Sequence, residues 1–90
     1  MKVYADKSFQ KDIEKLDTTA KKQISEIVLQ INQAPTIHQI PNIKKIKGFK
    51  NSYRIRLGNY RIGIRIELET VILVRILHRK DIYRYFPIFL

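Results

Sequence analysis

Apolar residues in the first part of the chain recur at the spacing of an amphipathic helix. Phe9, Ile13 and Leu16 lie four and three residues apart, which places them on one side of a helix. The short mixed run 2–5 before them is typical of a strand. We therefore expect a first strand and then a helix with one apolar side.

A second helical pattern follows after a short interruption. Asp17 can cap its first turn, and apolar residues repeat at helical spacing over 20–31. Pro35 cannot continue the helical hydrogen-bond ladder, so the helix should end just before it. The two segments predict a helical hairpin, and 35–43 should form a loop that leads into the lysine-rich run 44–50.

From residue 53 the apolar period changes to two. Tyr53, Ile55 and Leu57 alternate with Arg54 and Arg56, which indicates a strand with one apolar and one basic face. The apolar face should pack on the helices, and the basic face should lie on the other side of the sheet.

A two-residue turn at 58–59 would fix the pairing of this strand with the next one, because Gly-Asn favours such hairpin turns. The core face would then carry the pairs Tyr53–Ile64, Ile55–Ile62 and Leu57–Tyr60, and the other face Arg56–Arg61, Arg54–Gly63 and Ser52–Arg65. Arginines directly opposite each other repel by up to about 1 kcal/mol, and an anion between them removes this cost.

A nearly continuous apolar run over 70–77 predicts a central strand that is covered on both faces, with Arg75 reaching an edge. The expected fold class is α+β. An N-terminal strand and a two-helix hairpin pack on one face of a small, mainly antiparallel twisted sheet, and the arginine face stays open. The aromatic and aliphatic tail 82–90 should be buried on this domain or on a partner.

Length and composition narrow the class of protein. Ninety residues fit a single domain over 1–90 and leave no room for a second core. The chain has no cysteine, which excludes disulfides and thiolate metal sites and fits a reducing compartment. No apolar stretch approaches about 18 residues, and the start lacks the layout of a signal peptide. We expect a cytoplasmic protein that does not use a membrane.

Positive charge is concentrated in the second half of the chain. The net charge is +10, but residues 1–43 carry six basic and five acidic side chains, against twelve basic and three acidic ones in 44–90. Such a field attracts polyanions without selecting one. Nucleic-acid phosphates fit the strand-built basic surface, while anionic lipid and an acidic protein partner remain possible.

The residue types disfavour several kinds of chemistry. The chain has two histidines and no Asp/Glu cluster at ligand spacing, so we expect no metal site. Its three glycines form no phosphate-cradling loop, and no Ser/His/Asp set is evident, so we expect no nucleotide cofactor and no serine-type nucleophile.

The remaining side chains suit the chemistry of phosphates. An RNA phosphodiester can be cleaved without metal when its own 2′-hydroxyl attacks phosphorus, and fixed guanidinium groups stabilise the charge that develops. Proton transfer would then fall to Tyr83 or His78. The candidate catalytic residues are Arg54, Arg56, Arg61, Arg79, Tyr83 and His78. Those expected to bind and position nucleic acid are Lys44, Lys45, Lys47, Lys50, Arg65 and Lys80.

Each candidate also has an ordinary structural interpretation. Arg54 and Arg56 can form a solvated strand face. Tyr83 can pack under the sheet with its hydroxyl in water, and His78 can be a structural histidine at a strand end.

Two motifs resemble those of a known family. The run 45–62, with the letters KIKGFKNSYRIRLGNYRI, resembles the core motif of RelE/ParE-superfamily toxins, and HRKDIY at 78–83 resembles their closing motif. With the helical hairpin before them, the resemblance covers nearly the whole chain. It implies a RelE-like fold and a toxin of a bacterial type II toxin-antitoxin pair.

In the RelE branch the resemblance implies an endoribonuclease that cuts mRNA in the ribosomal A site. The family's basic strand positions fall on Arg54 and Arg56, its phosphate-stabilising arginines on Arg61 and Arg79, and its stacking or acid/base tyrosine on Tyr83. The resemblance also implies a small hetero-oligomer with an acidic antitoxin, which would cover the basic face or take up the hydrophobic tail.

Two other functions are compatible with the same fold. ParE-type members inhibit DNA gyrase without the ribonuclease residues, and a basic module could bind nucleic acid without catalysis. The presence of Arg61, Arg79 and Tyr83 favours the nuclease.

Overall fold

The computed structural model describes residues 1–88 and confirms an α+β fold. Its elements are β1 (Lys2–Ala5), α1 (Lys7–Glu14), α2 (Thr18–Gln33), the short 3₁₀ helix η1 (Ile37–Gln39), β2 (Ile43–Lys45), β3 (Ser52–Leu57), β4 (Tyr60–Glu67), β5 (Thr70–His78) and α3 (Ile82–Tyr85). No helix within this part of the chain is long and apolar enough to cross a membrane. The expected burial of the tail at residues 89 and 90 lies outside the described residues.

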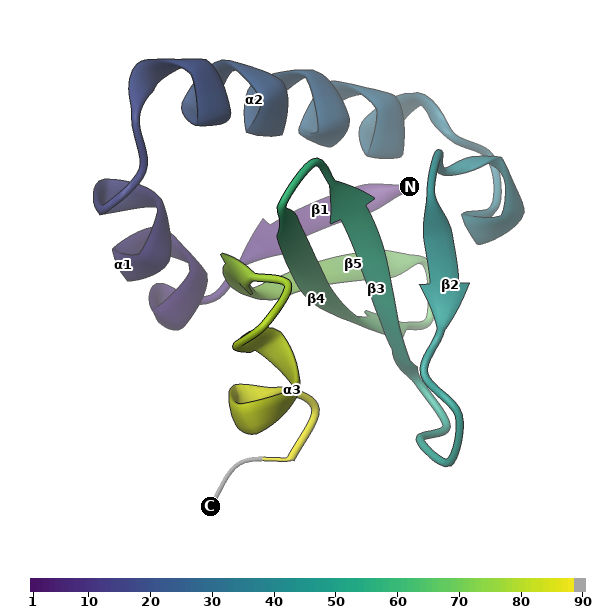
Figure 1. The fold of residues 1–90 in the computed structure, drawn as a ribbon. Helices are drawn as coiled ribbons and strands as arrows, with labels where there is room; N and C mark the ends of the chain where they lie inside the picture. The colour runs from purple at the N-terminus through teal and green to yellow at the C-terminus, as the bar shows by residue number, and fades with distance from the viewer. Residues whose placement is uncertain (89–90) are drawn as a thin grey trace.

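The strands form one five-stranded sheet in the order β1-β5-β4-β3-β2 (Figure 1). Strand β1 pairs with β5 in parallel, and the other neighbours are antiparallel. Strand β2 was not predicted, because its residues were expected to belong to a loop and to the lysine-rich run that follows it. Three residues at a sheet edge, two of them lysines, are too few to show a period of two.

The helical hairpin covers one face of the sheet, as predicted. The Asp17 carboxylate accepts a hydrogen bond from the Ala20 N–H at 2.8 Å and caps α2, which ends before Ala34. Phe9 and Ile31 are fully buried against Ile55 and other apolar side chains of the sheet. This face is the main hydrophobic core.

The predicted hairpin register of β3 and β4 is confirmed at all six pairs. Gly58 has a φ of 59°, a left-handed conformation that glycine adopts without steric cost. Arg56 therefore lies directly opposite Arg61 on the face away from α2.

The face of the sheet that carries the arginines is only partly open to solvent. The expectation that this face stays open is therefore wrong where α3 packs on β5. Ile82 and Phe86 are fully buried there and pack on Ile72 and Val74 of β5. A Cβ added at Gly63 would lie 2.6 Å from the Phe86 ring, so the space beside Gly63 is filled by this ring. Part of the apolar tail is therefore buried on the protein itself, and β5 is covered on both faces as expected.

Gly63→Ala is expected to lower the free energy of unfolding by about 1–3 kcal/mol, because the new methyl group overlaps a buried ring. Urea unfolding followed by circular dichroism measures the change. The Phe86→Leu background is the control, since a smaller side chain there should make Gly63→Ala less costly. An equal cost in both backgrounds would contradict this account of Gly63.

Candidate functional site

Four arginines gather where the β3–β4 turn meets the end of β5. Arg56 of β3 pairs with Arg61 of β4, and Arg54 lies two residues before Arg56 on the same face. The Arg79 N–H donates to the Asn59 carbonyl at 2.8 Å, which joins the end of β5 to the hairpin turn. We call Arg54, Arg56, Arg61 and Arg79 the arginine cluster.

The pKa of Arg61 is lower than the ordinary value of an arginine side chain. Partial burial lowers this pKa, and the positive charges of Arg54, Arg56 and Arg79 lower it further, while Tyr83 acts in the opposite direction. The Arg61 Nη1 donates to the carbonyls of Gly58 and Tyr60 at 2.9 Å each, which holds the guanidinium at the turn. The repulsion within the cluster would be relieved by a bound anion.

Within residues 1–88, no acidic side chain forms an ion pair with this cluster. Among residues 1–88, the ion pairs join Arg65 to Asp6 and Glu67, at 4.0 and 3.6 Å, and Arg75 to Asp12 at 2.8 Å. Arg65 was expected to bind nucleic acid. Its acidic neighbours and its position at the far end of the hairpin, opposite Ser52, separate it from the cluster.

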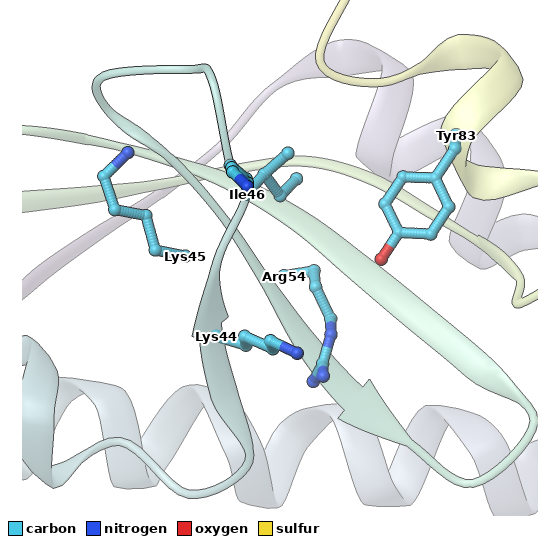
Figure 2. Close-up of a pocket in the computed structure, with 6 residues that line it drawn as sticks. Lys44, Lys45, Ile46, Arg54 and Tyr83 are labelled. Atoms are coloured by element: carbon cyan, nitrogen blue, oxygen red, sulfur yellow. The ribbon is translucent and has the colours of Figure 1, made fainter.

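Tyr83 belongs to α3, interacts electrostatically with Arg61 and is 59% exposed. It lines a pocket of about 260 Å³ together with Lys44, Lys45, Ile46, Lys47 and Arg54. Figure 2 shows the Tyr83 hydroxyl turned toward the sheet and the Lys44 amine beside the Arg54 guanidinium. Tyr83 therefore does not pack under the sheet, and a phosphate in this pocket can meet both its hydroxyl and cationic groups.

The lysines of the basic run occupy different positions. Lys44 pairs with Arg54 on the face of the arginine cluster, whereas Lys45 pairs with Tyr53 and places its Nζ 5.9 Å from the centre of that ring. Lys47 lines the pocket. Lys50 is exposed just before β3, and Lys80 is exposed just after β5.

A second hollow, of about 240 Å³, shares Lys44 and Arg54 with the pocket and is lined by Asn42, Ile43, Lys44, Arg54 and Arg56. The Asn42 carbonyl accepts hydrogen bonds from Arg54 Nη1 at 3.0 Å and from the Arg56 backbone N–H at 3.2 Å. Asn42 was not predicted as a site residue from the sequence. Its φ of 60° fits the tolerance of asparagine for left-handed turns, a weak signal in the sequence.

His78 does not join the arginine cluster. It pairs with Tyr60, whose side chain lies on the face of the main core, and the two rings meet edge to face with centroids 6.4 Å apart. Its Nδ1 accepts a hydrogen bond from the Lys80 backbone N–H at 3.2 Å. This geometry fits a structural histidine that supports the turn after β5.

Comparison with known proteins places this geometry in a family. Residues 3–83 match the family described as ParE toxin of type II toxin-antitoxin system, parDE. The chain belongs to this toxin family. The toxin is also 46% identical to Toxin RelE3 of Methanocaldococcus jannaschii over 88 residues, which cover 97% of this chain and 100% of that protein.

Solved structures agree with the family assignment. The RelB-RelE antitoxin-toxin complex from Methanococcus jannaschii contains a chain with a TM-score of 0.80 and 43% identity, over 93% of the toxin and 99% of that chain. A chain of the archaeal RelE-RelB complex from Pyrococcus horikoshii OT3 shares the fold with a TM-score of 0.74 at 19% identity, over 90% and 97% of the two chains. The protein is a toxin of a type II toxin-antitoxin system.

Proposed function

We propose that this toxin is a metal-independent endoribonuclease that cleaves mRNA at the ribosome and so inhibits translation. The observation that carries the proposal is the arginine cluster beside Tyr83, which has no acidic partner among residues 1–88. Preorganised guanidinium groups stabilise a phosphorane-like transition state, because its negative charge exceeds that of the ground state.

The proposed reaction is a transfer of the phosphate within the RNA chain. The 2′-oxygen forms a bond to phosphorus, the bond from phosphorus to the 5′-oxygen breaks, and the products are a 2′,3′-cyclic phosphate and a 5′-hydroxyl. Tyr83 acts as the phenolate, takes the proton from the 2′-hydroxyl and becomes the neutral phenol. A pocket ammonium group, from Lys44 or Lys47, gives a proton to the departing 5′-oxygen.

The hollows along β2 and β3 would hold the RNA on either side of the reacting phosphate. Both hollows are lined by Lys44 and Arg54, so the same two cations can contact RNA in either of them. Contacts to phosphates fix the position of a nucleic acid without reading its bases. Lys47, Lys50 and Lys80 extend this positive surface in our proposal.

Resemblance to RelE-type toxins supports mRNA on the ribosome as the substrate and the cytoplasm as the location. The same cationic surface supports an acidic segment in the cognate antitoxin. Such a segment would neutralise the arginine cluster and compete with RNA for it.

The direct test adds the purified toxin to ribosomes translating a defined mRNA and maps cut sites by primer extension. We expect cleavage within the message, with products ending in a cyclic phosphate. A matched mRNA with one 2′-O-methyl nucleotide at the main cut site should resist cleavage there, because the attacking hydroxyl is blocked. Cleavage at the methylated nucleotide would contradict the mechanism, and intact mRNA beside gyrase–DNA cleavage complexes would contradict the function.

A further inference from the structure

Helix α3 is a single turn whose side chains divide among three directions. Successive residues of a helix are rotated by about 100°, so residues four apart lie on the same side. Ile82 and Phe86 point at the sheet and are fully buried. Tyr83 and Tyr85 therefore project from opposite flanks, and a rotation of α3 about its axis would move both.

Tyr85 meets a charged side chain of β5. The Arg75 Cζ lies 5.3 Å from the centre of the Tyr85 ring, within the range of a cation–π contact. On the other flank, Tyr83 reaches the pocket that contains Arg54. The two tyrosines connect α3 to different parts of the sheet, so the Arg75 contact restrains the rotation that would displace Tyr83.

Arg75 is itself held rigidly by α1. Its Nε and Nη2 donate to the two carboxylate oxygens of Asp12 at 2.8 and 3.0 Å, and the Ile76 N–H donates to the same carboxylate at 3.0 Å. Asp12 is only 6% exposed, and its hydrogen bond raises the pKa of Arg75. A bidentate pair fixes the plane of a guanidinium group, and this plane determines where Tyr85 can stack.

We propose that Arg75, fixed by Asp12 and in contact with Tyr85, is a positioning residue that sets the rotation of α3 and so the place of the Tyr83 hydroxyl. The buried side chains of Ile82 and Phe86 hold α3 on the sheet, and the Arg75–Tyr85 contact sets the rotation of α3 about its axis. The catalytic consequence rests on the proposed ribonuclease function, whereas the structural restraint does not.

Tyr85 offers a clean test because it is half exposed and lies outside the core. Tyr85→Leu removes the aromatic face but keeps apolar bulk, and Tyr85→Phe keeps the ring. In Tyr85→Leu the Phe86 amide, which donates to the Ile82 carbonyl at 2.9 Å, should exchange hydrogen about three- to tenfold faster. Amides of β4 should be unchanged, and Tyr85→Phe should behave as wild type. Unchanged exchange in Tyr85→Leu would overturn the proposal.

A cleavage assay tests whether the restraint acts through Tyr83. Tyr85→Leu should slow single-turnover cleavage about tenfold at unchanged RNA affinity, and Tyr85→Phe should restore the rate. In a Tyr83→Phe background, Tyr85→Leu should cause no further loss. The same loss in both backgrounds would show that Tyr85 acts elsewhere and would overturn the proposal. A wild-type toxin without cleavage would reject the ribonuclease function, and hydrogen exchange would then decide the positioning role alone.

Discussion

Arg61→Ala is expected to slow RNA cleavage about 10²- to 10³-fold while leaving the fold intact. Arg61 lies at the centre of the arginine cluster, opposite Arg56 and close to the charges of Arg54 and Arg79. Its guanidinium is held in place by two carbonyls of the hairpin turn before any substrate binds. The substitution removes a preorganised positive charge, and single-turnover cleavage measured by gel electrophoresis reports the loss.

Arg65→Ala is the matched control for this experiment. Arg65 lies on the same face of the same strand, but its ion pairs with Asp6 and Glu67 place it outside the cluster. We expect its cleavage rate to stay within about threefold of wild type, because its charge lies outside the cluster. The loss of its partly exposed ion pairs should change the free energy of unfolding by only about 0–1 kcal/mol. Arg61→Lys should retain part of the activity through its charge. Equal losses in Arg61→Ala and Arg65→Ala would contradict a localised site.

Asp12→Ala is expected to lower the free energy of unfolding by about 3–5 kcal/mol, the largest stability effect we predict. The buried carboxylate accepts three hydrogen bonds, two from Arg75 and one from the Ile76 N–H. Its removal leaves a cationic group and a buried backbone donor without their partner. Urea unfolding at neutral pH measures the change.

Two variants control for nonspecific effects of substitution on α1. Glu14→Ala replaces an exposed carboxylate of the same helix and should change stability by less than about 0.5 kcal/mol. The double variant Asp12→Ala/Arg75→Met should be more stable than Asp12→Ala alone, because the cation is removed with its partner. If the double variant is the less stable one, the unpaired charge is not the cause of the loss.

Features set by local pattern were predictable from the sequence. The Gly58-Asn59 turn and the alternation around Arg54 fixed both the register of the hairpin and the face of its arginines. Asp17 and Pro35 likewise predicted the limits of α2, since helix caps depend on adjacent residues.

Features set by distant contacts could not be predicted in this way. The run 70–77 is almost uniformly apolar, so it does not reveal the bulge in the β4–β5 pairing at Gly63 and Ile64. A shift of one residue reverses the face of every later side chain, and beyond this bulge His78 pairs with Tyr60 on the face of the main core. The burial of Asp12 depends on Arg75, more than 60 residues away in the chain.

The three-residue strand β2 has a consequence for the association of the toxin with itself. It forms an edge of the sheet, and such edges readily pair with a second copy of the same chain. Strand β2 is short, so it offers few backbone groups to a second chain. Lys44 and Lys45 also oppose the pairing, because two such edges would bring like charges together. The cations proposed to hold RNA thus also protect the free toxin from edge-to-edge aggregation. Replacing them with neutral residues would weaken this protection together with RNA binding.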